Sequence, residues 1–157
     1  MAVLDDGSEL PYDLFLAVPV HRVPEVVERS GLATDGWVAV DHRTLATRWP
    51  GVYAVGDVTS VGTPKAGVFA EGQASVAAEA ILAQVRGEQA GPGYDGRGVC
   101  YVEFGNHEVA LVDVTFPDDA EPSGFLEGPS VEIAAAKGEF GTSRIRRWFG
   151  RDWAPLS

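Results

Sequence analysis

Short apolar runs, bounded by glycine, proline and polar residues, characterise the first half of the chain. Residues 12–18 (YDLFLAV) and 52–55 (VYAV) are too short for helices and rich in β-branched and aromatic side chains, so each predicts a buried strand. Residues 36–41 alternate between apolar and small or polar positions, which predicts a third strand. The turn signal at residues 5–8 (DDGS) predicts a hairpin within residues 1–10.

A helical pattern follows the second of these strands. Residues 66–86 contain no proline and carry apolar side chains at helical spacing, so the sequence predicts a long helix there. Gly56-Asp57 therefore lies between a predicted strand and a predicted helix, an arrangement typical of a ligand site at the carboxyl edge of an α/β sheet. A shorter helical turn is predicted at residues 25–30. The expected buried face of the long helix consists of Phe69, Val76, Ala77, Ala80, Ile81 and Val85.

The second half of the chain begins after a segment rich in glycine, proline and charge. Residues 87–97 predict a linker and no core element. Residues 99–104 and 108–116 predict two strands that form a hairpin at Gly105-Asn106. An acidic loop is expected at residues 117–129.

The carboxyl-terminal region has a weaker pattern. Residues 131–137 are compatible with either a strand or a helix, and Phe140-Gly141 is expected to end that element. Residues 143–153 (SRIRRWFGRDW) mix arginines with aromatic side chains. This composition suits a helix that covers the body of the domain with its arginine stems, or one that contacts a membrane surface.

Composition narrows the classes of function. The net charge of −11 disfavours non-specific nucleic-acid binding, which needs a basic surface. No apolar run approaches the roughly 20 residues needed to span a bilayer, and the acidic start is unlike a signal peptide, so a cytoplasmic location is expected. Cys100 is the single cysteine, and the three histidines are far apart in sequence. The sequence therefore predicts neither an internal disulfide nor a metal site.

A family resemblance rests on two consecutive segments. RWPGVYAVGDV, followed by PKAGVFAEGQASVAAEAI, resembles the second flavin-binding motif of the FAD-dependent pyridine nucleotide-disulfide oxidoreductases. The segment PKAGVFAEGQA is most similar to the sulfide:quinone oxidoreductase and flavocytochrome c sulfide dehydrogenase branch. The resemblance covers nearly the whole chain but only the second half of the family's protein. The first half, with its amino-terminal GxGxxG and nicotinamide-type domain, is expected to be missing here. The resemblance implies FAD as the cofactor.

The resemblance also implies roles for individual residues. Asp57 would accept a hydrogen bond from the ribityl chain of FAD, and a turn or cap aspartate is the alternative. The start of the long helix would face the pyrimidine edge of the isoalloxazine ring, where its dipole and Lys65 would stabilise negative charge. A solvated surface lysine is the alternative for Lys65. The implied cofactor-binding residues are Gly56, Asp57, Val58, Lys65, Ala66, Gly67 and Val68.

Cys100 is the catalytic candidate. In the sulfide-oxidising branch, a cysteine near this position pairs with a second cysteine to form a redox disulfide or persulfide beside the flavin. The alternative is a buried structural cysteine. In the same branch, carboxyl-terminal amphipathic helices lie on the membrane near the quinone, so residues 143–153 are implied as a peripheral contact with the inner membrane face.

The expected fold is α/β with a mixed sheet: a partial Rossmann-like FAD-binding layer and a small α+β carboxyl-terminal cap. We divide the chain into a hairpin remnant of the nicotinamide-type domain (1–11), the carboxyl-terminal part of the FAD-binding domain (12–86), a linker (87–97) and a cap or interface domain (98–157).

Two functions are carried forward from the sequence. The first is the FAD-binding portion of an oxidoreductase that passes electrons from sulfide, another reduced sulfur species or a nicotinamide to a quinone or similar acceptor. The second is a non-catalytic, truncated or split-subunit binding module. Such a module would need an amino-terminal partner chain that carries GxGxxG, or would form a homodimer through an exposed sheet edge.

Overall fold

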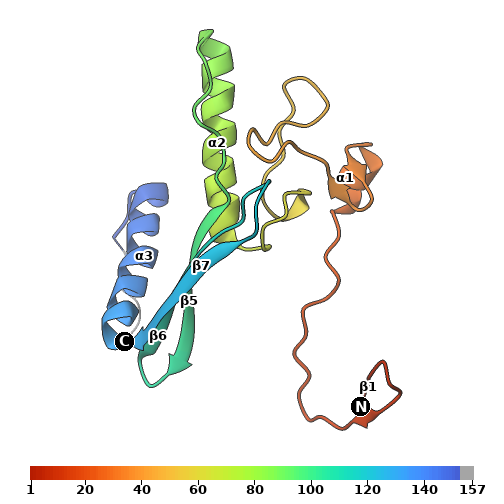
Figure 1. Cartoon of the computed structure of the whole chain (residues 1–157), viewed down its shortest axis with the longest axis vertical. Coiled ribbons are helices and arrows are strands. Elements are labelled where there is room, and N and C mark those ends of the chain that lie inside the picture. The colour runs from red at the N-terminus through yellow and green to blue at the C-terminus, as the bar shows by residue number, and fades with distance from the viewer. Residues whose placement is uncertain (153–157) are drawn as a thin grey trace.

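The structure is a computed structural model that describes residues 1–152. Helices and antiparallel sheets are combined in it, so the fold is α/β in the broad sense. The long helix α2 (Gly67–Arg86) has a three-stranded sheet and the helix α3 (Val131–Phe149) on one side, and the amino-terminal half of the chain on the other (Figure 1). The Rossmann-like layer remains a prediction.

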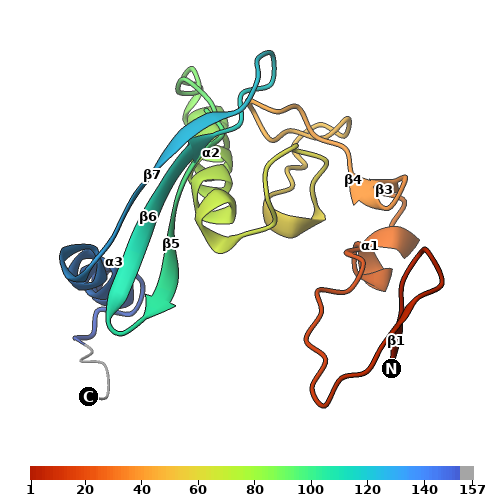
Figure 2. The ribbon, with the colours of Figure 1, turned by 60° about the horizontal axis from the view of Figure 1, so that its bottom comes forward.

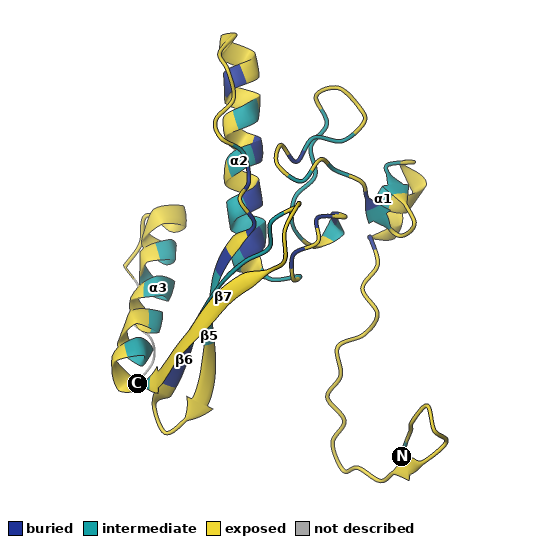
Figure 3. Ribbon diagram, in the orientation of Figure 1, coloured by how far each residue is buried: buried dark blue, intermediate teal, exposed yellow. Residues whose placement is uncertain are grey.

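The amino-terminal region confirms two predicted elements and corrects a third. β1 (Ala2–Val3) and β2 (Glu9–Leu10) pair antiparallel as the expected hairpin, and α1 (Glu25–Arg29) is the expected short helix. The buried strand predicted at residues 12–18 is wrong, because this segment is exposed and makes no strand pairing (Figure 3). Its apolar pattern is that of a buried strand, but the described residues provide no neighbouring strand to pair with it.

The strands predicted around the glycine–aspartate turn are shorter than expected. β3 (Ala33–Thr34) and β4 (Trp37–Val38) are two-residue strands that pair antiparallel. β4 lies within the strand predicted at residues 36–41, and β3 precedes that range. Residues 52–55 form no strand, and only Tyr53 makes an isolated bridge, to Ala46. Within the described part of the chain, the expected mixed sheet is reduced to one isolated parallel bridge, between Val38 and Thr59.

The long helix is confirmed, but its buried face differs from the predicted one. Its buried positions are Phe69, Gln73, Ala77 and Ala83. Ile81 and Val85, expected on the buried face, are exposed. The carboxyl-terminal half of α2 extends beyond the sheet in Figure 1, so apolar residues there have less to pack against.

The predicted hairpin in the second half is confirmed and gains a third strand. β5 (Arg97–Gly105) and β6 (Glu108–Thr115) pair antiparallel around a turn in which Asn106 and His107 have positive φ. β7 (Ser123–Ser130) pairs with the other edge of β6, where an acidic loop was expected. The free backbone groups of β6 make this pairing favourable although the β7 sequence has weak strand propensity.

The helix α3 resolves the ambiguity left by the sequence. Its N-cap is Ser130, whose hydroxyl accepts a hydrogen bond of 3.2 Å from the Ile133 N–H. The predicted break at Phe140-Gly141 is wrong, because the helix continues to Phe149. A helical glycine costs only about 1 kcal/mol relative to alanine, and the Phe140 ring packs edge-on against Tyr101 of β5, with a centroid separation of 5.3 Å.

The two faces of the sheet have different environments. α3 lies against one face, where Phe140 meets Tyr101 and Lys137 pairs with Glu103 (Figure 2). On the opposite face, here called the open sheet face, Phe69 of α2 packs against Phe116 at one end. In β5 and β7, Val102, Phe104 and Leu126 are exposed. By strand alternation and register, the side chains of the open sheet face are Cys100, Val102, Phe104, Val112, Val114 and Leu126.

A separate small core lies beside α2. It joins Leu45 and Val61 to Ala77 of the helix and to Tyr94. Tyr94 comes from residues 87–97, so the interpretation of that segment as free of core residues is wrong. Its backbone N–H also donates to the Arg43 carbonyl at 2.7 Å. The division of the chain into domains stays a prediction.

Candidate functional site

The glycine–aspartate turn forms a single turn of 3₁₀-helix, η1 (Gly56–Val58). Gly56 has a φ of 75°, and a Cβ there would lie 3.3 Å from the Ala70 Cβ of α2. Glycine is therefore required both by backbone conformation and by close approach. Asp57 is exposed and Val58 is partly buried. The turn thus presents a solvent-accessible carboxylate directly beside the start of α2.

The Lys65 side chain contacts the residues that precede it in the chain. Its ammonium donates a hydrogen bond of 2.6 Å to the Thr59 carbonyl and lies 4.3 Å from the centroid of the Trp37 ring. Burial lowers the pKa of Lys65, and the charge of Asp57 partly offsets this effect. Lys65 is therefore partly buried and hydrogen-bonded within the chain. It is not the solvated surface lysine that was the alternative interpretation.

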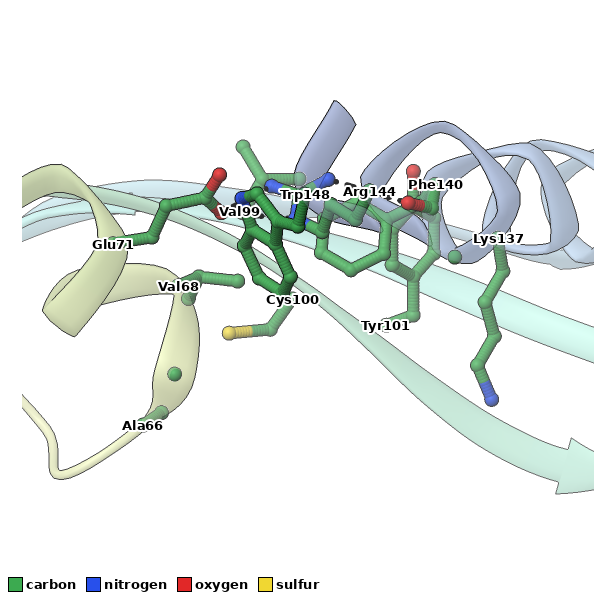
Figure 4. Close-up of a pocket in the computed structure, with 12 residues that line it drawn as sticks. Ala66, Val68, Glu71, Val99, Cys100, Tyr101, Lys137, Phe140, Arg144 and Trp148 are labelled. Carbon is green, nitrogen blue, oxygen red and sulfur yellow. Dashed lines mark hydrogen bonds and ion pairs between the residues drawn. The ribbon is translucent and has the colours of Figure 1, made fainter. Parts of the chain in front are cut away.

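A pocket of about 450 Å³ lies between the start of α2, the middle of β5 and one side of α3. Its walls are mostly apolar, and three aromatic rings contribute to them (Figure 4). The N–H groups of Gly67 and Val68 belong to the first turn of α2, where a helix leaves backbone donors without internal partners. The lining residues are Ala66, Gly67, Val68, Glu71, Val99, Cys100, Tyr101, Lys137, Phe140, Gly141, Arg144 and Trp148.

Ion pairs between α2 and α3 lie at the edge of this pocket. Glu71 accepts from Arg144 at 2.7 Å and from Arg147 at 3.1 Å. The Arg144 guanidinium also lies 3.5 Å from the centroid of the Phe140 ring. Glu71 and Arg144 are largely shielded from water, whereas Arg147 is exposed. One carboxylate therefore links the two helices that form opposite walls of the pocket.

Cys100 is half-buried in the β5 wall of the pocket. Figure 4 shows its sulfur directed toward the start of α2 and away from α3. Burial raises the pKa of the Cys100 thiol. Because the thiolate is the nucleophilic form, this environment keeps the side chain in its less reactive state at neutral pH.

The structure brings some of the predicted site residues together. Ala66, Gly67, Val68 and Cys100, which are about 30 positions apart in sequence, line one pocket. Gly56, Asp57, Val58 and Lys65 lie on the turn and loop before α2 and are not among its lining residues.

Sequence reasoning missed the aromatic wall of the pocket and the buried amide of Gln73. Phe140 and Trp148 both lie in α3. The sequence analysis placed Phe140 at the end of one element and Trp148 in the separate segment 143–153. Gln73 is only 1% exposed. A signal for it was present, because Gln73 is four positions from both Phe69 and Ala77 and therefore lies on the same helical stripe.

The sequence also contains one segment with GxGxxG spacing, which the sequence analysis did not identify. Residues 91–96 read GPGYDG. They lie between α2 and β5, whereas a phosphate-binding turn follows a strand and opens a helix. Two of the glycines are explained by packing: a Cβ on Gly93 would lie 2.8 Å from the Arg43 carbonyl oxygen, and one on Gly96 would overlap the Phe116 carbonyl. The motif therefore has no phosphate-binding geometry.

Two further site types are absent from the described residues. No group of three or more histidine, cysteine, aspartate or glutamate side chains within residues 1–152 is arranged to hold a metal ion. Within the same range, no helix has the length and apolar character needed to cross a membrane. Trp153, part of the predicted membrane-contacting tail, lies outside the described residues.

Comparison with known proteins identifies curated relatives, one of which is informative about the family. The mitochondrial sulfide:quinone oxidoreductase of Schizosaccharomyces pombe is 33% identical over 124 residues, which cover 76% of this chain. The chain is related in sequence to sulfide:quinone oxidoreductase. It spans 27% of the length of that relative, so it corresponds to a minor part of the longer enzyme. No family model matches the chain.

A solved structure is similar to the fold. A chain in the cryo-EM structure of the mitochondrial ATP synthase of Tetrahymena thermophila, an F1Fo composite tetramer, matches with a TM-score of 0.56. The match covers 83% of this chain and 30% of that one, at 21% sequence identity. At this identity the match shows a shared fold and nothing about activity.

Proposed function

We propose that the chain is the flavin-facing, carboxyl-terminal part of a flavin-dependent oxidoreductase that transfers electrons as sulfide:quinone oxidoreductase does. The observation that carries this proposal is the pocket at the start of α2, which is lined by Ala66, Gly67, Val68 and Cys100. The family motif selected Ala66, Gly67 and Val68 from the sequence, and Cys100 was selected separately, by its approximate position in the sulfide-oxidising branch. The sequence relationship to sulfide:quinone oxidoreductase supports the same assignment independently of the geometry.

The residues present fit one end of FAD. A mostly apolar pocket of about 450 Å³ suits a planar ring system, and the exposed Asp57 carboxylate can accept from the hydroxyls of a ribityl chain. Gly56 approaches α2 closely, and its positive φ and a 3.3 Å contact of an added Cβ with Ala70 both favour glycine there. The pyrophosphate end does not fit equally well, because GPGYDG has the wrong structural context. We therefore assign only the ring and ribityl end of FAD to this chain.

FAD would supply the chemistry of accepting and passing on electrons. The residues of this chain would hold and orient it. Asp57 would fix the ribityl chain, and the N–H groups of Gly67 and Val68 at the positive end of the α2 dipole would stabilise negative charge on the ring. Lys65 would act from a distance, because its ammonium is bonded to the Thr59 carbonyl. Cys100 would lie beside the site with its thiol protonated.

The α3 side of the pocket supports a quinone as the acceptor, which would lie beside the flavin ring held at the α2 side. Tyr101, Phe140 and Trp148 form an aromatic, mostly apolar wall. Such a wall favours a quinone over a nicotinamide nucleotide, whose phosphates and ribose hydroxyls need more polar partners. The exposed aromatic residues Trp148 and Phe149 and the neighbouring arginines of α3 suit a peripheral contact with an anionic membrane surface, where a quinone would be found.

The test of this proposal is a titration of the purified chain with FAD, followed by flavin fluorescence. We expect saturable binding that weakens at least about tenfold in Asp57→Ala, because a hydrogen bond to a charged group is lost. Asp118→Ala, which removes an exposed acidic side chain from the loop before β7, is the matched control and should leave the affinity unchanged. Equal affinities of the native chain and Asp57→Ala would contradict the assigned role of Asp57. No binding by the native chain would contradict flavin binding by this chain alone.

The open sheet face favours a second function, a binding module that a partner completes. This face is mostly apolar, and Val102, Phe104 and Leu126 are exposed on it. Residues 12–20 add a second exposed apolar surface, with Leu16 and Val18 both at least 80% exposed. Contiguous exposed apolar surface is typical of an interface. The candidate partners are an amino-terminal flavin-binding chain and a second copy of this chain.

Sedimentation velocity separates these possibilities from the first proposal. A native dimer that dissociates in Phe104→Glu, but not in Val85→Glu on the exposed side of α2, would support a homodimer through the open sheet face. A native monomer that binds FAD without a partner would argue against the module.

A further inference from the structure

The buried polar side chains of the described residues gather around the Gly56–Asp57 turn. There are three of them: Thr59 and Gln73, each 1% exposed, and Thr63, 7% exposed. Thr59 and Thr63 follow the turn in sequence, and Gln73 reaches it from the second turn of α2. Polar groups are costly to bury unless they are hydrogen-bonded, so their collection at one place needs an explanation.

These side chains hold the Gly56 residue from both sides. The Gly56 N–H donates a hydrogen bond of 2.7 Å to Oε1 of Gln73. The Gly56 carbonyl accepts from the Thr59 hydroxyl at 2.9 Å and from the Thr59 N–H at 3.1 Å. Gln73 in turn donates from Nε2 to the Thr63 hydroxyl at 3.3 Å. The backbone that sets the direction of Asp57 is therefore fixed by a connected buried network.

Helix packing alone does not account for a glutamine at this position. Gln73 lies between Phe69 and Ala77 on the buried stripe of α2, where an apolar residue would pack without the cost of a buried amide. What glutamine adds is an acceptor for the Gly56 N–H. Without it, this N–H would lose its partner in a partly buried turn with positive φ.

We propose that Gln73 is a positioning residue that presets the Gly56–Asp57 turn for its ligand. The inference rests on the proposed function, in that the ligand of Asp57 is taken to be the ribityl chain of FAD. The amide holds Gly56 against α2, and Asp57 is thereby kept exposed at the edge of the site. Because the turn is already ordered, ligand binding does not lose the conformational entropy of ordering it, and the affinity for the ligand is higher.

The first arm of the test measures the turn itself and needs no ligand. Amide hydrogen exchange at Gly56, followed by NMR, is compared in the native chain, Gln73→Met, Gln73→Glu and Gln84→Met. Gln84 is an exposed glutamine on the same helix and is the matched control. We expect Gln73→Met to speed Gly56 exchange by about tenfold, the loss of roughly one hydrogen bond. Gln73→Glu keeps an acceptor oxygen and should preserve slow exchange.

The second arm measures FAD affinity in the same four proteins, with far-UV circular dichroism to verify the fold of each. We expect Gln73→Met to bind FAD about tenfold more weakly than the native chain, with Gln73→Glu closer to native and Gln84→Met unchanged. Unaltered Gly56 exchange in Gln73→Met would overturn the proposal. So would an FAD affinity equal to that of Gln84→Met. If the native chain fails to bind FAD, the proposed function fails, and the exchange arm alone decides whether Gln73 positions the turn.

Discussion

Glu71 of α2 and Arg144 of α3 form an ion pair of 2.7 Å at the edge of the pocket, and both side chains are largely shielded from water. α3 has no fully buried residue, so few of its contacts fix it in place. This pair joins the wall formed by α3 to the wall formed by the start of α2.

We predict a measurable coupling energy between Glu71 and Arg144. A double-mutant cycle with Glu71→Gln and Arg144→Met, measured by urea unfolding, should give a coupling of about 0.5–1 kcal/mol, which decreases at high salt. Glu103→Gln, which breaks the more exposed pair with Lys137, is the comparison and should cost less. Additive effects of Glu71→Gln and Arg144→Met would contradict a direct interaction.

Gly98 is predicted to be intolerant of any side chain. A Cβ at this position in β5 would overlap the Phe69 ring of α2. Gly98→Ala should therefore lower the free energy of unfolding by about 1–3 kcal/mol, through displacement of Phe69 or of the strand. Gly138→Ala in α3 is the control, because nothing lies within 4 Å of its Cβ and alanine favours helix, so it should stabilise by about 0.5–1 kcal/mol. The prediction fails if both variants unfold at the same urea concentration as the native chain.

The sequence predicted elements whose determinants are local. The helix α2 and the hairpin of β5 and β6 follow from periodicity and turn residues, and both are confirmed. Residues 12–18 have the sequence pattern of a buried strand but are exposed. The pattern shows that these residues are suited to strand pairing, and it does not show whether a neighbouring strand is present. β7 shows the reverse case, since pairing with β6 overrides its weak propensity.

The same distinction applies to the candidate site. The family motif selected Ala66–Val68, and these residues do line the pocket, but their opposite wall comes from residues more than 70 positions away. No local signal connects Phe140 or Trp148 to the start of α2. Gln73 could have been found from its spacing to Phe69, which places it on the buried stripe of α2. The roles of Asp57 and Cys100 toward a flavin stay predictions.

Cys100 is predicted to react slowly with thiol reagents. Burial raises the pKa of its thiol, so the reactive thiolate forms only at higher pH than in an exposed cysteine. The rate of alkylation by iodoacetamide should therefore rise with pH to a midpoint above the pKa of a free cysteine, which is about 8.5 in model peptides. Trp148→Ala, which opens the pocket beside it, should increase the rate. Rapid alkylation of the native chain below pH 7 would instead indicate an activated thiolate.

The hydroxyl of Tyr94 is predicted to be dispensable for stability, although its ring is not. Tyr94 is buried in the small core beside α2, and among the described residues its hydroxyl has no partner with hydrogen-bond geometry. Burial raises the pKa of this hydroxyl, and the nearby polar groups of Gln73 and Thr63 partly offset the rise although neither has hydrogen-bond geometry toward it. An unpaired buried hydroxyl costs free energy, so Tyr94→Phe should leave the free energy of unfolding unchanged or raise it by up to about 1 kcal/mol.

Tyr94→Ala separates the ring from the hydroxyl. This variant removes the whole side chain from a packed core and should destabilise by about 3–5 kcal/mol, as large-to-small aromatic substitutions do. Both variants are compared with the native chain by urea unfolding, with the slope of the transition monitored for two-state behaviour. A loss of more than about 1 kcal/mol in Tyr94→Phe would mean that the hydroxyl is bonded in solution. Gln73 would then also bond the Tyr94 hydroxyl, and Gln73→Met would disturb the small core as well as the Gly56–Asp57 turn.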